Sequence, residues 1–140
     1  EARRLGVLEK MVFAGRIPYA EVPTYLRVMD VALSTQTNNL PGQVRTTGKL
    51  PEYMAAERFV LASRVGEAAL VLPELMLLDY DGEVDRSYPR RLAERIRHLQ
   101  QRPEQLSLRL ELPAKARELC SYDVLAGRFQ AVIQQATASP

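Results

Sequence analysis

One stretch indicates the architecture of this chain most strongly: Thr46-Thr47-Gly48-Lys49-Leu50-Pro51-Glu52-Tyr53-Met54-Ala55-Ala56. It is typical of a glycine-containing loop that opens a helix, with Pro51 tolerated because it lies in the first turn. The first N–H groups of a helix are unpaired and lie at the positive end of its dipole, so a helix that starts near Gly48 can hold a phosphate. A carboxylate one turn further in, at Glu52, is placed to accept hydrogen bonds from ribose hydroxyls. This combination predicts the nucleotide-binding part of an α/β enzyme.

The sequence on both sides of this stretch alternates between short apolar runs and helical patterns. The apolar runs predict buried strands at residues 11–14, 31–34, 58–63 and 75–78. Apolar residues at helical spacing predict helices at 21–30, from Gly48 onward, at 67–72, from Tyr88 for about thirteen residues, from Pro103 with a restart at Pro113, and at 123–135. In the last helix we expect an inner face of Leu125, Phe129, Val132 and Ile133. Residues 35–47 are expected to form a polar loop of about a dozen residues, which is long for a compact domain.

This order predicts an α/β fold of the Rossmann-like kind, with a mostly parallel sheet, flanking helices and only helices at the C-terminal end. Ligands of such sheets bind at the carboxyl ends of the strands, and the loop after Leu33 lies at such an end. The chain begins at Glu1 without a methionine and passes directly into a helical turn and a strand. We therefore expect residues 1–140 to be part of a larger protein, with a sheet that is incomplete at its N-terminal side.

Composition limits the function classes. The 46% apolar and 26% charged residues are typical of a globular protein, and the net charge of +2 gives no electrostatic reason to expect a nucleic-acid partner. No apolar run approaches the ~18 residues that a membrane span needs, and no signal peptide opens the chain. The single cysteine, Cys120, cannot form an internal disulfide, which fits a cytoplasmic location. One cysteine and one histidine leave no zinc site of the usual type, so we expect no metal.

Several segments, in order, resemble a known family. They are residues 12–18, a strand followed by Gly15-Arg16; 29–32, Met-Asp-Val-Ala; 49–56, with Glu-Tyr-Met-Ala-Ala; 60–66, a strand and a Val-Gly loop; and 120–128, an entry into the last helix with Tyr122 in place of the usual Trp. From about Val7 to its last helix, the chain resembles the C-terminal half of a retaining glycosyltransferase with two facing Rossmann-like domains (the GT-B fold), of the family 4 or group 1 class.

The resemblance implies that this half binds a nucleotide-diphosphate sugar as donor substrate, in a transferase of polysaccharide or glycan biosynthesis. Residues 1–140 would be a partial nucleotide-sugar-binding domain, and a missing N-terminal domain would bind the acceptor. Transferases of this class keep the anomeric configuration and need neither a metal nor another cofactor. The fragment alone would be inactive.

The resemblance also implies roles for individual residues. Glu52 matches the carboxylate that holds the ribose. The remaining matches are Thr47, Gly48 and Lys49 to the diphosphate-binding helix start, Gly15, Arg16 and Ile17 to the segment that lies against the base, and Asn39, Gly42 and Gln43 to the loop that meets the donor sugar. No residue of the chain is assigned as catalytic.

Two positions depart from the pattern of the family. Val44 stands eight positions before Glu52, where the family often carries a Glu that touches the sugar, so the sugar contact is either shifted to Asn38, Asn39 or Gln43 or absent. Glu57 stands where a Gly usually follows Met-Ala-Ala. If that site needs a left-handed backbone, Glu costs about 1 kcal/mol relative to Gly.

These departures keep two other functions open: a degenerate Rossmann-like module that serves in binding or assembly without catalysis, and a same-fold nucleotide-sugar epimerase.

Simpler roles are open for single residues. Glu52 and Lys49 are also typical of solvated helix starts, and Arg16 of a surface ion pair. His98 reads as a solvated side chain and Cys120 as a small core residue. The arginines at 86, 90, 91, 95, 97 and 102 allow a peripheral contact with anionic lipid at the inner face of the membrane.

Overall fold

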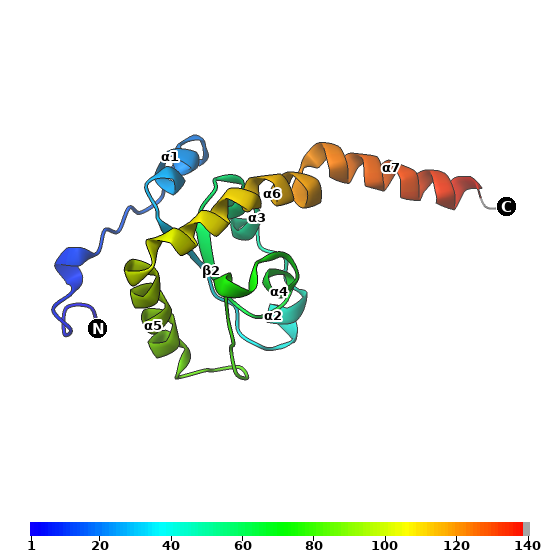
Figure 1. Ribbon diagram of the computed structural model, residues 1–140. Coiled ribbons are helices and arrows are strands. Elements are labelled where there is room, and N and C mark those ends of the chain that lie inside the picture. The colour runs from blue at the N-terminus through cyan, green and yellow to red at the C-terminus, as the bar shows by residue number, and fades with distance from the viewer. Residues whose placement is uncertain (139–140) are drawn as a thin grey trace.

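The computed structural model describes residues 1–138 and has a mixed α/β fold around a three-stranded parallel sheet. The strands are β1 (Val31–Ser34), β2 (Phe59–Ser63) and β3 (Leu77–Leu78), in the order β1-β2-β3. Every residue of β2 is buried, and this strand pairs in parallel with both neighbours (Figure 1). A strand buried on both faces needs a nearly continuous apolar sequence, which Phe59-Val60-Leu61-Ala62 provides.

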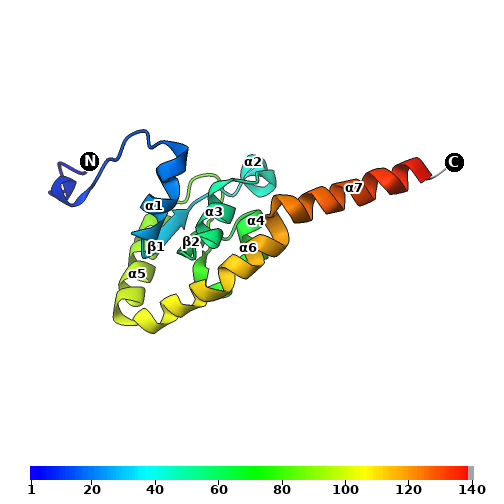
Figure 2. The same cartoon turned by 90° about the horizontal axis from the view of Figure 1, so that it is seen from above.

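Helices connect and cover the strands (Figures 1 and 2). The chain passes from a 3₁₀ turn (Tyr19–Glu21) and α1 (Val22–Arg27) into β1, and then through α2 (Leu40–Val44) and α3 (Lys49–Ala55) into β2. The elements that follow β2 are α4 (Glu67–Val71), a 3₁₀ turn (Glu74–Met76), β3, α5 (Tyr88–Gln101), a 3₁₀ segment (Pro103–Glu111), α6 (Leu112–Cys120) and α7 (Tyr122–Ala138). A further 3₁₀ turn lies at Leu8–Lys10. The core joins β2 to side chains such as Met54, Met76 and Leu112.

The predicted parallel sheet is confirmed for the strands at 31–34 and 58–63, and β3 covers the last two residues of the predicted 75–78 strand. The predicted helices form as well, with α1 shorter than expected. The loop expected at 35–47 contains one short helix that the sequence analysis did not predict. Asn39 caps this helix, because its side-chain oxygen accepts a hydrogen bond of 3.0 Å from the N–H of Gly42.

The strand predicted at residues 11–14 is wrong. These residues take no part in the sheet, and Val12 is 94% exposed. An apolar run shows only that burial would be favourable. A strand also needs cover for its two faces to offset the entropy of ordering it, and Met11 and Phe13, which are 46% and 72% exposed, lack such cover as well. The outer edge of β1 is therefore unpaired within the described part of the chain.

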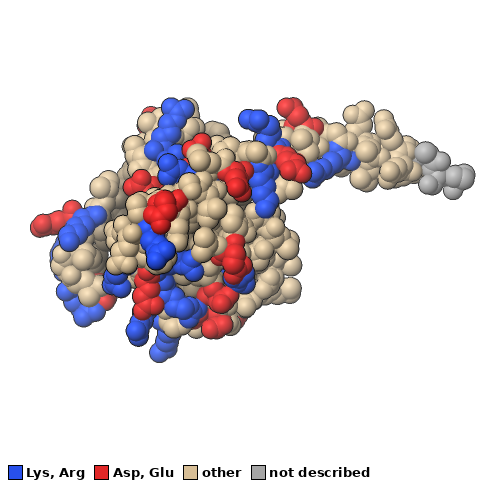
Figure 3. Space-filling model, in the orientation of Figure 1, with Lys and Arg blue, Asp and Glu red and all other residues tan. Residues whose placement is uncertain are grey.

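The inner face predicted for the last helix is also wrong. Leu125, Phe129, Val132 and Ile133 are exposed, Phe129 to 67%. Ser121 alone separates α6 from α7, and its extended backbone directs α7 away from the sheet (Figures 1 and 2). The spacing of these residues correctly identifies one apolar face of a helix, but it carries no information about what covers that face. Beyond Arg128 the helix bears no charged side chain (Figure 3).

The turn between α3 and β2 places Glu57 at a φ of 58°, in the left-handed region. The turn is closed by hydrogen bonds from the N–H of Glu57 to the Met54 carbonyl, 3.0 Å, and from the N–H of Arg58 to the Tyr53 carbonyl, 2.9 Å. Glu57 therefore has the left-handed backbone for which we expect a cost of about 1 kcal/mol relative to Gly. The carboxylate of Glu57 lies 3.8 Å from Arg109, in a half-exposed ion pair.

Arg58 holds the C-terminal ends of α1 and α3 together. Its Nε donates to the Ala56 carbonyl at 2.8 Å, and its Nη1 donates to the carbonyls of Met29 at 2.8 Å and Arg27 at 3.1 Å. The last carbonyls of a helix lack partners within the helix and lie at its negative end, so a guanidinium is well suited to bind them.

Replacing Glu57 with Gly should raise the free energy of unfolding by about 0.5–1 kcal/mol, because glycine adopts a positive φ without the steric cost of an L side chain. Denaturant titration measures the change. Glu57→Gln is the control: it keeps the backbone cost and removes only the charge of an exposed pair, for which we expect about 0.5 kcal/mol or less. A Gly variant less stable than the Gln variant would contradict the argument.

Replacing Arg58 with Ala should lower the free energy of unfolding by about 1–3 kcal/mol, because helix-end carbonyls lose a charged donor. Arg58→Lys should recover only part of this loss, because an ammonium lacks the planar fork that reaches several carbonyls. Arg90→Ala removes an arginine from a surface pair with Glu94 and serves as the control, with an expected effect of about 0–1 kcal/mol. Equal stabilities of the Arg58→Ala and Arg90→Ala proteins would show that Arg58 does not join the helices.

Candidate functional site

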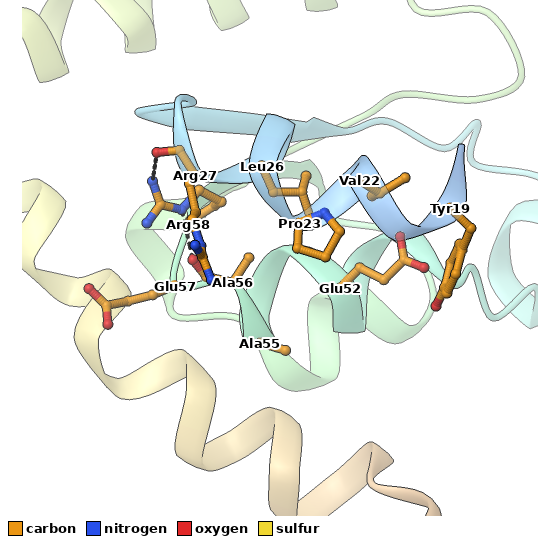
Figure 4. A pocket seen from close by; sticks show the side chains of 10 residues that line it. All are labelled: Tyr19, Val22, Pro23, Leu26, Arg27, Glu52, Ala55, Ala56, Glu57 and Arg58. Carbon is orange, nitrogen blue, oxygen red and sulfur yellow. Dashed lines mark hydrogen bonds between the residues drawn. The ribbon is translucent and has the colours of Figure 1, made fainter. Parts of the chain in front are cut away.

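A pocket of about 530 Å³ lies between α1 and α3. This volume is within the range of small-molecule sites in proteins. The pocket is open along its length, and its lining is more apolar in the middle than at the ends (Figure 4). The lining residues are Tyr19, Val22, Pro23, Leu26, Arg27, Glu52, Ala55, Ala56, Glu57 and Arg58.

Glu52 lies at one end of the pocket, beside Tyr19 (Figure 4). The helical start at Gly48 positions it: the N–H of Glu52 donates to the Gly48 carbonyl at 3.3 Å, which fixes the first turn of α3. The side chain is half-buried, and its carboxylate has no hydrogen bond or ion pair with any described residue. Two carboxylate oxygens therefore face the pocket with their acceptor capacity unused, and a ligand with hydroxyl groups would satisfy them.

At the other end of the pocket, the charges of Arg58 and Glu57 are already paired, whereas the exposed guanidinium of Arg27 has no partner among the described residues. The Arg58 guanidinium binds the three carbonyls named above, and Glu57 faces Arg109. Between the two ends, the floor is formed by apolar side chains of α1 and α3, among them Pro23, Leu26 and Ala55. The pocket thus offers a free carboxylate at one end, the free guanidinium of Arg27 at the other and an apolar surface between them, which suits a molecule with hydroxyl groups and a flat apolar part.

Burial raises the pKa of Tyr53, and the negative charge of its neighbour Glu52 adds to the effect. The phenol therefore stays neutral at physiological pH. Tyr53 does not line the pocket, and no group that does has a partner arrangement typical of a general base or an activated nucleophile. The geometry therefore supports binding of a ligand and assigns no catalytic residue.

The predicted diphosphate-binding residues Thr47, Gly48 and Lys49 lie at the start of α3, one turn before Glu52 and outside the pocket lining. Gly48 and Lys49 are exposed, and their N–H groups have no hydrogen-bond partner among the described residues. α3 has only seven residues, so its dipole is modest. The helix start is as predicted, and its binding of a diphosphate stays a prediction.

The predicted base-binding residues Gly15, Arg16 and Ile17 lie just before Tyr19 in the chain and do not line the pocket themselves. Gly15 has a φ of 66°, and Arg16 is exposed. Of this part of the chain, Tyr19 lines the pocket together with Glu52, and Tyr19 starts the 3₁₀ turn that follows the segment.

The predicted sugar-binding residues Asn39, Gly42 and Gln43 belong to the start and body of α2 and are not part of the pocket. Their polar groups are used within the protein. The Nε2 of Gln43 donates to Asn38 at 2.6 Å, and its Oε1 accepts from the N–H of Gly66 at 3.2 Å. Val44 is exposed and no acidic side chain of α2 replaces it. The structure therefore does not join this group to Glu52 in one cavity.

The sequence analysis missed Tyr19 and Arg58 as residues of this pocket. Tyr19 follows the predicted base-binding segment after Pro18, so an aromatic residue next to that segment was the available signal. Nothing in the sequence marked Arg58, because its role depends on where two helices end.

A second pocket, of about 610 Å³, lies beside β3 and α5. Several of its charged groups satisfy one another: Arg64 pairs with Glu74 and, at 2.7 Å, with Asp79. The Arg64 guanidinium lowers the pKa of Glu74, so that carboxylate stays ionised. His98 lies in this pocket as well. Arg95 donates to the Leu75 carbonyl at 3.1 Å, and Glu94 pairs with Arg90. Each carboxylate that lines this pocket thus has a partner, unlike that of Glu52 in the first pocket.

Three further sequence interpretations concern residues outside the first pocket. Burial raises the pKa of Cys120, and the charge of Glu67 raises it further, which is the opposite of an activated thiol. Leu92, Ile96 and Leu99 of α5 pack against the core, so the apolar stripe beside the arginines is not free to insert into a membrane. Within residues 1–138, no three or more His, Cys, Asp and Glu side chains gather in a metal-binding group, and none of the helices has the length and apolar character to cross a bilayer.

In comparisons with known proteins, no protein-family model, no curated protein and no solved structure matches this chain.

Gly66 connects β2 to α4 at a position where only glycine fits. Its φ is 57°, and an added Cβ would lie 2.7 Å from the carbonyl oxygen of Gly42 and 2.9 Å from that of Gln43. We expect Gly66→Ala to lower the free energy of unfolding by about 1–3 kcal/mol, because both backbone strain and contact with α2 oppose the methyl group. Gly48→Ala is the matched control, since a Cβ there meets nothing within 4 Å. Thermal unfolding of the two variants tests this, and equal midpoints would show that α2 does not pack on Gly66 as described.

Proposed function

We propose that this chain forms the donor-nucleotide-binding half of a retaining, metal-independent glycosyltransferase with Rossmann-like domains. The observation that carries the proposal is the unpaired carboxylate of Glu52 in the pocket between α1 and α3. Glu52 is also the residue that the resemblance to family 4 glycosyltransferases assigns to the ribose. Two lines of argument that do not depend on each other thus select the same side chain.

The arrangement of the sheet supports the same proposal. In open parallel sheets, ligands bind beyond the carboxyl ends of the strands. Buried Ser63 at the end of β2 ties down the loop that follows β1: its Oγ accepts from the N–H of Gln36 at 2.7 Å and donates to the Gln36 carbonyl at 2.8 Å. From this edge the chain continues to Gly48, where α3 begins, so Glu52 stands on the side of the sheet where a Rossmann-like fold holds its nucleotide.

The proposed reaction transfers a sugar from a nucleotide-diphosphate sugar to an acceptor hydroxyl with retention of configuration. Glu52 accepts the ribose hydroxyls, and the free N–H groups of Gly48 and Lys49 bind the diphosphate. As the glycosidic bond breaks, negative charge develops on the leaving diphosphate, and these donors stabilise it. The acceptor hydroxyl attacks from the face that the diphosphate leaves. A separate N-terminal domain supplies the acceptor site.

A second candidate function is a binding or assembly module without catalysis. The observation that favours it is the internal use of Gln43 and Asn39 together with the absence of an acid at Val44. Such a module would carry the pocket but hold no donor sugar. The epimerase alternative gains no support, since His98 lies beside β3, in the second pocket.

The test is the thermal stability of the intact protein with UDP, GDP or ADP. A nucleotide present at 100 times its dissociation constant should stabilise the folded state by about 2.7 kcal/mol, and the unfolding midpoint should rise with one of the three. Glu52→Ala should lose most of this rise, because the ribose hydroxyls lose their acceptor.

Glu21→Ala is the matched control, since Glu21 is an exposed acid of the neighbouring 3₁₀ turn that does not line the pocket. It should keep the rise of the wild-type protein. No rise with any nucleotide would reject the transferase in favour of the binding module, and an equal rise in the Glu52→Ala protein would reject the ribose site.

A further inference from the structure

We propose that Tyr19 is the nucleobase platform of this site: its ring stacks on the base of the nucleotide whose ribose is held by Glu52. This inference rests on the proposed function and adds to it the residue that contacts the base. The resemblance to glycosyltransferases assigns the base to Gly15, Arg16 and Ile17, none of which lines the pocket.

The position of Tyr19 carries the first part of the argument. The ring lines the same end of the pocket as Glu52, and the two side chains lie side by side (Figure 4). Tyr19 is 81% exposed, and its hydroxyl has no hydrogen-bond partner among the described residues. The aromatic face is therefore open to a ligand, beside the free carboxylate of Glu52.

The backbone holds the ring in this place. Pro18 precedes Tyr19 with a φ of −55°, and its carbonyl accepts a hydrogen bond of 2.9 Å from the N–H of Glu21. This bond closes the 3₁₀ turn that leads directly into α1. An aromatic side chain on a closed turn loses little further backbone entropy when a ligand binds.

The chemistry of the two side chains selects a nucleoside. A carboxylate repels phosphate and accepts hydrogen bonds from hydroxyl groups, so the hydroxyl groups of a ligand and not its phosphates contact Glu52. In a nucleoside, the base is attached to the carbon next to the one that carries the 2′-hydroxyl. A ribose bound to Glu52 thus places its base within reach of a neighbouring ring, and stacking suits both purines and pyrimidines because each base has a π-face.

Calorimetric titration of the intact protein with UDP, GDP and ADP tests the inference. For the nucleotide that binds wild type most tightly, Tyr19→Ala should weaken binding about 5- to 150-fold, which corresponds to a stacking free energy of about 1–3 kcal/mol. Tyr19→Phe should retain wild-type affinity, since the ring and not the hydroxyl makes the contact. Tyr25→Ala removes a tyrosine of α1 that does not line the pocket, and it should leave binding unchanged.

The 2′-deoxy form of the same nucleotide separates the two contacts. It should bind wild type more weakly than the ribonucleotide, keep that difference in the Tyr19→Ala protein and lose it in the Glu52→Ala protein. Wild-type affinity in the Tyr19→Ala protein, with binding lost in the Glu52→Ala protein, would overturn this inference and leave the proposed function standing. Absence of nucleotide binding by the wild-type protein would overturn both. Unfolding midpoints without ligand show whether each variant is folded.

Discussion

Parallel pairing of β1 with β2 is the constraint on which the rest of this structure depends. Two parallel strands have the same ends at the same edge of the sheet, so the chain must cross from the end of one strand to the start of the next. Here α3 makes that return, starting at Gly48 on the carboxyl side and ending next to Phe59 on the amino side. Glu52 reaches the carboxyl side because it lies in the first turn of this helix. The candidate site is thus a consequence of the strand topology.

The same topology explains why α1 and α3 enclose a pocket. Both helices precede a strand and run in the same direction, so their N-terminal ends lie together, with Tyr19 in the 3₁₀ turn that leads into α1 and Glu52 in the first turn of α3. Their C-terminal ends are joined by the Arg58 guanidinium, next to the strained backbone of Glu57. At the joined end the charges of Arg58 and Glu57 are paired and Arg27 has no partner among the described residues, while at the open end the Glu52 carboxylate is unpaired. The unpaired carboxylate distinguishes this pocket from the one beside β3, where Glu74 and Asp79 both pair with Arg64.

Where local pattern and burial coincide, the sequence predicted the structure well. The apolar run of β2 and the helix that opens at Gly48 depend on residues close together in the chain. The sequence raised a left-handed backbone at Glu57 only as a condition, and the structure has it. The predictions of a strand at residues 11–14 and of a buried face on α7 were wrong for one reason. Both patterns indicate surfaces that would gain from burial, but burial also requires a partner surface. The helix capped by Asn39 was missed because a short polar helix has little periodicity. Glu52 was found from its helix position, whereas Tyr19 and Arg58 join the pocket through contacts between distant segments, which a single sequence does not display.

The central claim is that the Glu52 carboxylate receives the hydroxyl groups of a ribose between α1 and α3. The most direct measurement is a crystal structure of the intact protein with the nucleoside diphosphate that stabilises it. The account predicts ribose oxygens at hydrogen-bond distance from the Glu52 carboxylate, about 2.5–3.0 Å. A nucleotide bound elsewhere, for example against Arg64 and Arg95 beside β3, with Glu52 in contact with water alone, would contradict it.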